Sequence, residues 1–406
     1  MAFKLETKSG YNMYTMASLL QKAIRRGDEN GAGYAAYEMF GNFHTVLWNR
    51  ILTVSAEDCW GIVTKEIIAL RYADEMANQN KKWYAKDTQY VAKAVNLLCK
   101  AKKSRDACYY ACNFVLSTEI QNPGSISELF IKKCKDEMNA VSKDIMSIKG
   151  LSGKIESLPS CENERMADIQ MSLFDFDREA SEDNQVTLYD LGSEERVTAL
   201  AALLRKGIRT LNMELAGYAI HELRKVDIPC IWKMLYVMAN NECNGTLVKE
   251  VLGLKIAEDY VNRKKPLDKR DEIYVCKAVM LIMYHISDDY GPLESVAIIN
   301  TEKMIEWTDD YKRIEECYLM KIPEWVFDVH TYQGKAAGKT DWEMNLVEYA
   351  ALKPLQIGFF DNASWEPRYQ WKYKNGKCTE KEYRDMLEYR IGRRGNPVEK
   401  IPDKFQ

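Results

Sequence analysis

The 406-residue sequence contains no apolar run long enough to cross a membrane, and it contains only four histidines. A membrane-spanning helix needs about 20 consecutive apolar residues, and the stretch from Met1 to Glu6 lacks the apolar core of a signal peptide. The eleven cysteines include no Cys-x-x-Cys pair and do not pair with histidine at zinc spacing. These absences predict a cytoplasmic protein in a reducing compartment, without a membrane span, a disulfide framework, a metal or another cofactor.

Residue sets for known catalytic chemistry are also missing. No Ser/His/Asp set and no recognisable pair of carboxylates occurs, so we expect no enzymatic activity. The segment from Gly334 to Thr340, GKAAGKT, has three residues between its first glycine and Gly-Lys-Thr, whereas a phosphate-binding Walker A loop needs four. Asp328 and His330 precede it, and we interpret them as a hydrogen-bonded helix cap rather than an acid–base pair.

Two parts of the chain resemble each other when the sequence is displaced by 184 positions. LLQKAIR from Leu19 aligns with LLRKGIR from Leu203, and KEIIALRYADEMAN from Lys65 aligns with KEVLGLKIAEDYVN from Lys249. The alignment needs no gap over roughly 90 residues, which indicates an internal duplication. Apolar residues recur at helical spacing in both copies, so the sequence predicts an all-α fold with two tandem multi-helix domains.

Two basic positions recur in the first helix of each copy. Lys22 and Arg25 align with Lys206 and Arg209, and each pair is three residues apart on one helix face. A solvated face is the interpretation that we favour, and contact with phosphates is the alternative.

The segment between the copies has a different composition. From Glu156 to Glu195 there are twelve acidic and two basic residues, which predicts a flexible linker. The expected organisation is therefore a first repeat domain over 1–150, closed by a helix at Ser125–Ile148, and an acidic linker over 151–195. A second repeat domain over 196–352 and a basic aromatic tail over 353–406 follow.

One apolar cluster within this linker resembles the peptide that binds bacterial sliding clamps, usually written Q-L-(S/D)-L-F. It consists of Gln170, Met171, Ser172, Leu173 and Phe174. An extended peptide can place Leu173 and Phe174 in an apolar pocket while Gln170 forms hydrogen bonds beside it, although ordering the peptide limits its affinity. The alternative is that these apolar side chains pack back onto a helical domain.

A wider resemblance covers the repeats and the Gly/Lys segment, roughly two-thirds of the chain. MASLLQKAIRRGDENGAGYAAYEMF (16–40) and LWNRILTVSAEDCWG (47–61) resemble the C-terminal helical region of the replication-associated recombination protein A family, the MgsA-type AAA+ ATPases. DVHTYQGKAAGKT (328–340) resembles a segment of phage-type relatives of that region, which makes Gly334, Lys335, Gly338 and Lys339 a family signature rather than a nucleotide loop. The ATPase domain is absent, so the resemblance implies a helical, oligomer-forming part of a bacterial or phage replication protein.

The C-terminal tail combines aromatic and basic side chains. From Arg368 to Arg394 there are nine basic and four acidic residues, and RYQWKYKNGKCT alternates rings with lysines before an Asn-Gly turn signal. This pattern predicts a strand, a tight turn and a helix ending at Arg393 and Arg394. We expect nucleic-acid contact, with lysines at phosphates and rings on exposed bases, through Lys335, Lys339, Tyr369, Trp371, Lys372, Tyr373, Lys374, Arg393 and Arg394. The alternative is that the rings cap the second helical domain and the lysines keep it soluble.

Together these patterns predict a non-catalytic accessory protein of DNA replication or recombination. It would bind DNA, possibly as a single strand, be recruited to a bacterial sliding clamp and form a homo-oligomer. The main alternative is a phage interaction protein that inhibits a host replication or defence complex without DNA affinity.

Overall fold

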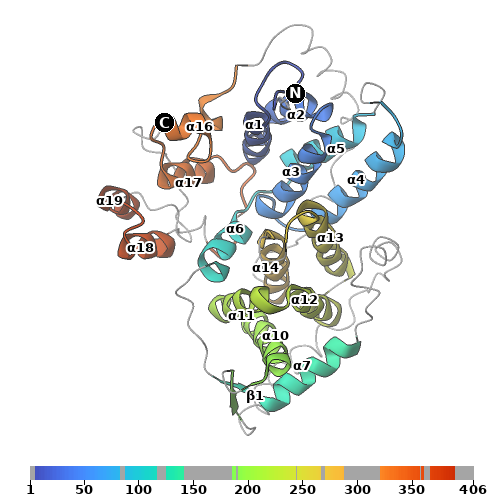
Figure 1. Cartoon of the computed structure of the whole chain (residues 1–406), viewed down its shortest axis with the longest axis vertical. Coiled ribbons are helices and arrows are strands. Elements are labelled where there is room, and N and C mark those ends of the chain that lie inside the picture. The colour runs from blue at the N-terminus through green and yellow to red at the C-terminus, as the bar shows by residue number, and fades with distance from the viewer. Residues whose placement is uncertain are drawn as a thin grey trace. The chain divides into compact units, whose positions relative to one another are not determined.

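The structure is a computed structural model, and it describes residues 5–82, 87–116, 125–140, 185–188, 191–243, 245–266, 270–287, 321–356, 358–360 and 366–388. Over these residues the fold is all-α, as the sequence predicts, with one pair of three-residue strands (Figure 1). No helix among the described residues is long and apolar enough to cross a membrane.

The chain forms two compact units. The first unit comprises residues 1–109 and 294–406, and the second comprises residues 110–293. This division differs from the expected boundaries. The Gly/Lys signature was expected in the second repeat domain, but it belongs to the unit of the first repeat. The helix expected to close the first domain belongs instead to the second unit, which begins at residue 110.

Six helices lie in the described residues of the N-terminal part of the first unit. They are α1 (Met13–Arg26), α2 (Glu29–Phe40), α3 (His44–Glu57), α4 (Thr64–Asn78), α5 (Gln89–Lys100) and the short α6 (Asp106–Tyr110), whose last residue lies at the boundary of the two units. Asn12 caps the start of α1 by accepting hydrogen bonds from two backbone N–H groups. Gly27 ends α1 in the left-handed conformation, with φ at 64°. These two residues fix the length of the helix that carries Lys22 and Arg25.

The described residues of the second unit form a π-helical turn, six helices and the strand pair. Its elements are η2 (Ala111–Val115), β1 (Ser125–Ser127), α7 (Glu128–Ala140), β2 (Gln185–Thr187), α10 (Ser193–Arg209), α11 (Met213–Val226), α12 (Ile228–Glu242), α13 (Gly245–Asn262) and α14 (Ile273–Ser287). Ser125 pairs with Thr187 in antiparallel register. The helix expected at Ser125–Ile148 corresponds to α7, which packs against α10 of the second unit.

Helix positions in the two units follow the 184-residue separation found in the sequence. Helices α2 and α11 begin at Glu29 and Met213, and α3 and α12 begin at His44 and Ile228. Helices α5 and α14 follow the same rule. Each aligned segment therefore forms the same succession of helices within its own unit.

Side-chain contacts recur at the same separation. In the first unit Arg25 Nε lies 2.8 Å from Asp58 Oδ1, and in the second unit Arg209 Nε lies 2.8 Å from Glu242 Oε1. The Asn78 side chain accepts a hydrogen bond from the Asp87 backbone, and Asn262 does the same for Asp271. The correspondence thus extends from helix bounds to the polar contacts within each unit.

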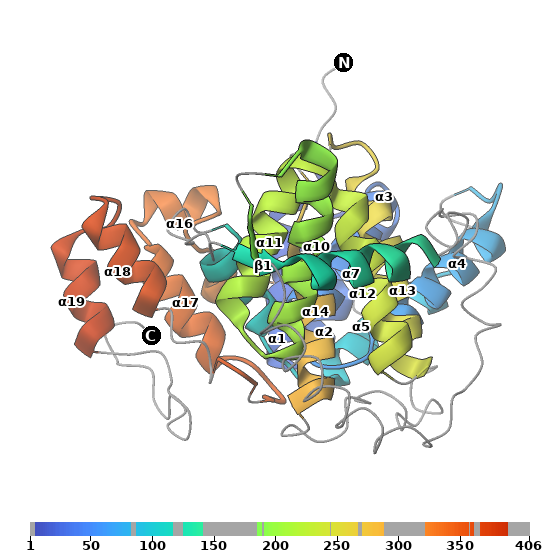
Figure 2. The same ribbon diagram turned by 90° about the horizontal axis from the view of Figure 1, so that it is seen from below.

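In the C-terminal part of the first unit, the residues that the structure describes form four helices and a 3-10 turn. These are η6 (Glu324–Val326), α16 (Tyr332–Ala336), α17 (Asp341–Ala350), α18 (Glu366–Lys374) and α19 (Glu380–Glu388). Figure 2 shows α18 and α19 as neighbouring helices joined by a short turn.

The expected strand over RYQWKYK is therefore wrong, because this segment forms α18. Gly376, with φ at 63°, ends α18 in the left-handed conformation, and Lys377 N–H donates to Lys372 O at 2.7 Å. The Asn-Gly pair terminates a helix here rather than turning a β-hairpin.

Candidate functional site

The signature segment 328–340 folds as the short helix α16 between two side-chain caps. Thr331 Oγ1 accepts a hydrogen bond from Gly334 N–H at 3.1 Å and donates one to Asp328 O at 2.9 Å. At the other end Thr340 and Glu343 cap each other reciprocally as α17 begins. The expected hydrogen bond between Asp328 and His330 is present, because the Asp328 carboxylate accepts from His330 N–H at 2.8 Å. It lies in the turn before α16, however, and the residue that caps this helix is Thr331.

Two glycines of the signature have separate structural reasons. A Cβ atom on Gly334 would lie 1.9 Å from the carbonyl oxygen of Asp328, so α16 can approach this backbone only where a side chain is missing. Gly338 has a φ of 70° and nothing within 4 Å of its Cβ position, so its requirement is conformational. Gly334 thus permits a close backbone approach, and Gly338 permits the left-handed conformation that follows α16.

The backbone N–H groups of this segment are engaged internally. Gly338 N–H donates to Lys335 O, and Lys339 N–H donates to Gly334 O, each at 3.0 Å. Thr340 N–H donates to the Glu343 carboxylate at 3.0 Å. A phosphate-binding loop must present such groups unpaired to its anion, so this arrangement does not form a nucleotide cradle.

Lys22 of α1 anchors the start of the signature. Its ammonium group donates to Trp325 O at 3.0 Å and to Val326 O at 2.9 Å, and it lies 2.7 Å from Asp328 Oδ2. Ser18, one turn earlier on α1, donates to the same Val326 carbonyl. Lys22 is thus buried against the signature, which differs from both sequence interpretations of this residue.

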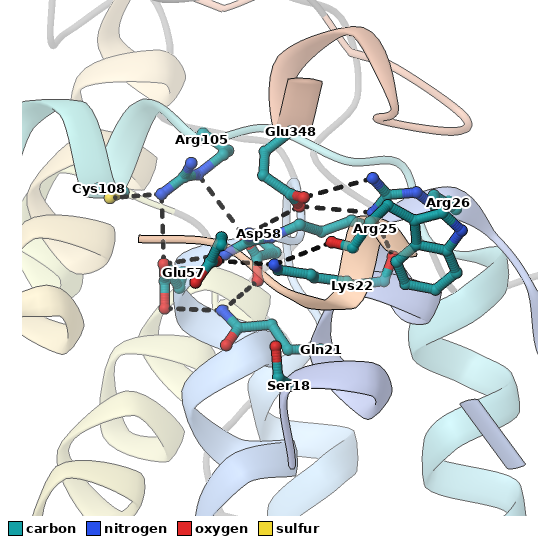
Figure 3. A network of polar contacts seen from close by, with 12 residues as sticks. Ser18, Gln21, Lys22, Arg25, Arg26, Glu57, Asp58, Arg105, Cys108 and Glu348 are labelled. Carbon is teal, nitrogen blue, oxygen red and sulfur yellow. Dashed lines mark hydrogen bonds and ion pairs between the residues drawn. The ribbon is translucent and has the colours of Figure 1, made fainter. Parts of the chain in front are cut away.

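Arg25 joins α1 to two other parts of the first unit, as Figure 3 shows. Its guanidinium lies 2.8 Å from Asp58 at the end of α3 and 2.9 Å from Glu348 of α17, and it also pairs with Glu57 at 3.2 Å. Arg26 reaches the second oxygen of Glu348 at 3.3 Å and lies over the Trp325 ring at 4.2 Å. Arg25 is therefore a buried structural cation rather than a solvated or phosphate-binding one.

Eight charged residues around Arg25 form what we call the α1 charge cluster. They are Lys22, Arg25, Arg26, Glu57, Asp58, Arg105, Asp328 and Glu348. Arg105 completes it by lying 3.4 Å from Glu57 and 3.0 Å from the thiol of Cys108. The described side chains provide four cations and four carboxylates, so the cluster is balanced in charge.

The protonation equilibria reflect burial and pairing together. Burial lowers the pKa of Lys22 despite the nearby carboxylates. Burial alone would raise the pKa of Glu348, but the charges of Arg25, Arg26 and Lys22 hold it below the usual range. The pKa of Asp328 is lowered further, because hydrogen bonds from His330 and the charge of Lys22 outweigh burial. The same contact with Asp328 raises the pKa of His330.

The predicted nucleic-acid residues divide into enclosed and exposed groups. Tyr369 is 1% exposed, packs edge-to-face on Trp342 and accepts a hydrogen bond from Asn345. Its ring cannot stack on a base, so this part of the prediction is wrong. Lys372 forms an ion pair with Asp341 and lies over the Tyr369 ring, and Lys339 lies 3.9 Å from Glu324.

The exposed group lies mainly on α18 and the turn that follows it. Tyr373 is 40% exposed and stacks on Tyr383 with centroids 4.4 Å apart. Lys374 is exposed, as is Lys335 on α16. Trp371 is half-buried beneath the exposed Lys377, whose ammonium lies 4.5 Å from the ring centroid. The remaining predicted residues, Gln170, Met171, Ser172, Leu173, Phe174, Arg393 and Arg394, lie outside the described residues.

The sequence analysis did not identify Tyr332 as a candidate binding residue. This tyrosine, inside the signature, has the most exposed large apolar side chain of the described residues, at 85%. No signal in the sequence reveals this, because the exposure of Tyr332 depends on how α16 packs against the rest of the first unit. Comparisons with protein-family models, curated proteins and solved structures find no match to this chain.

Proposed function

We propose that this protein is a non-catalytic accessory factor of DNA replication or recombination that binds DNA and is recruited to a bacterial sliding clamp through residues 170–174. The observation that supports DNA contact best is the basic surface of α18 and its turn. Residues 368–378 contain four basic and no acidic side chains, and Lys374 and Lys377 are exposed.

The basic surface of α18 and its turn can contact the phosphates of a nucleic acid. Lysines at the end of α18 can replace counterions at phosphates, which supplies affinity without base recognition. Tyr373 is held by its stack on Tyr383, so its exposed edge is ordered before any ligand arrives. The opposing charges lie on α19, where Glu380 pairs with Arg384 and Glu382 caps the helix. Binding is therefore expected to be modest and strongly dependent on salt.

The proposal is tested by fluorescence anisotropy of labelled DNA titrated with the full chain over a range of salt concentrations. In K374Q/K377Q two phosphate contacts are lost, so affinity falls and the slope of log K against log salt decreases by about 2. K264Q/K265Q is the matched control, because it removes the same charge from two exposed lysines of the second unit. A chain that does not bind DNA, or equal losses in both variants, would contradict the proposal.

Clamp recruitment is tested separately. The intact chain is titrated against an immobilised bacterial sliding clamp beside a Q170A/L173A/F174A variant. Binding that is lost in the variant and changes little with salt supports a peptide-in-pocket contact. Clamp binding without DNA binding would favour the alternative of an inhibitory interaction protein.

A further inference from the structure

The exposed ring of Tyr332 is the starting point. Single apolar side chains are common on protein surfaces, so exposure alone has no functional meaning. What distinguishes Tyr332 is the rigidity of the backbone that carries it. Thr331, immediately before it, is bonded to both Asp328 and Gly334. Gly334 in turn lies against the Asp328 backbone without space for a Cβ atom.

The α1 charge cluster also holds the backbone that leads into α16. Lys22 is bound to the carboxylate of Asp328 and to the carbonyls of Trp325 and Val326. The backbone that carries Tyr332 is therefore held by a buried ion pair on one side and by the cap of α16 on the other. Because this backbone is already fixed, binding of a flat ligand by the ring costs the rotamer freedom of one side chain and no ordering of the loop.

Cationic groups flank the ring. Lys335 is exposed and lies three residues after Tyr332, so both side chains lie on one face of α16 at about 5–6 Å between Cβ atoms. His330 is 70% exposed, and its contact with Asp328 raises its pKa toward the cationic form. The two carboxylates that act on His330 also have cationic partners, Asp328 in Lys22 and Asp341 in Lys372.

We propose that Tyr332 stacks on an unpaired base of a single-stranded nucleic acid while Lys335 contacts a neighbouring phosphate. This inference rests on the proposed function and adds the strand type and a residue to it. A single strand is required because duplex bases are already stacked and present no face to a protein ring. Neighbouring positions on one helix face suit one nucleotide, whose base and phosphate are covalently joined.

The test uses the full chain and two fluorescein-labelled probes, a 12-nucleotide oligothymidine and a 12-base-pair duplex. Y332A is expected to weaken single-strand binding about 5- to 150-fold, which corresponds to about 1–3 kcal/mol for one stacked base, and to leave duplex binding unchanged. Y332F retains the ring and is expected to retain affinity. Y14A is the matched control, because Tyr14 on α1 is also exposed, at 64%.

The outcomes separate this inference from the proposed function. If the wild-type chain binds neither probe, the proposed function fails and the inference fails with it. If the wild-type chain binds but Y332A and Y14A match it on both probes, DNA binding stands and the assignment of Tyr332 is overturned. Equal losses on single strand and duplex in Y332A would also overturn it, because stacking acts on unpaired bases. Unchanged thermal melting of each variant verifies that the fold is intact.

Discussion

The guanidinium of Arg25 lies 2.9 Å from the carboxylate of Glu348, although 323 residues separate them in the chain. Both groups are buried, and the same arginine also holds Asp58 at the end of α3. The pair therefore connects the first helix of the first repeat to the helix that follows the signature. The position of the signature depends on this connection as well as on Lys22.

Replacing Glu348 by alanine is expected to destabilise the packing of α17 on α1 by about 3 kcal/mol, because the buried cluster would then hold four cations and only three carboxylates. Amide hydrogen exchange in residues 321–353 should accelerate accordingly. E324Q is the control, since the Glu324 side chain is 89% exposed and a change within about 0.5 kcal/mol is expected there. Equal exchange rates in E348A and wild type would show that this ion pair does not hold the segment.

Substitution of the two signature glycines should have unequal effects. G334A places a methyl group against the Asp328 carbonyl, so α16 must move and the melting temperature should fall strongly. G338A strains only a left-handed residue and should cost about 1 kcal/mol. Thermal denaturation by circular dichroism measures both. G10A serves as a control for strain alone, because Gly10 has a φ of 84° and open space around it. A loss in G334A no greater than in G10A would contradict the close approach.

The contact between His330 and Asp328 predicts a pH dependence. The pKa of His330 is raised above its ordinary value of 6.5, so its stabilising contribution is complete below pH 6.5 and disappears as pH rises through the raised folded pKa. The pKa of Asp328 is lowered from 3.8, so its contribution is present above that pH and is lost only in stronger acid.

The melting temperature of wild type should therefore decline relative to H330Q as pH rises from 6.5 into the alkaline range. Other titrating groups are common to both proteins and cancel in the difference. A difference between the two melting temperatures that does not change with pH would refute the contribution of His330.

ATP with magnesium is expected to leave the melting temperature unchanged, because the N–H groups around Gly338 and Lys339 are already bonded within the chain. Differential scanning fluorimetry over a range of ATP concentrations measures this directly. A saturable stabilisation that disappears in K339A would instead show that the segment rearranges to bind phosphate, and it would reopen the possibility of an enzyme.

The sequence predicted the all-α fold correctly, because helix formation depends on local apolar spacing and on caps that the residues display. It also paired Arg25 with Arg209, although it did not reveal that both are bound to acidic side chains at the ends of α3 and α12. The partner of a charged residue on a helix face depends on long-range packing. Spacing along one helix cannot distinguish a solvated lysine from one enclosed by a distant segment.

The same limitation explains the two differences in the C-terminal part. The signature follows the second repeat in the chain, which suggested that it belongs there. In the first unit, however, Lys22 binds the signature and Arg25 binds Glu348 of the helix that follows it. In α18 the alternating rings and lysines favoured a strand. A helix instead enables Tyr369 to pack on Trp342 and leaves Tyr373 on the exposed side. The free energy gained by this tertiary packing outweighs the preference of the alternating rings and lysines for a strand.

The contact between Lys22 and Val326 joins residues that are 304 positions apart, and this has a consequence for synthesis in the cell. At about 5–20 residues per second, a ribosome needs about 15–60 s to make the chain between them. During that interval the nascent α1 carries Lys22 and Arg25 without the segment that later encloses them. All of the second unit leaves the ribosome in the same interval. The first unit is thus begun first but completed last. Chains that terminate before Val326 should therefore be preferred substrates for proteases and chaperones.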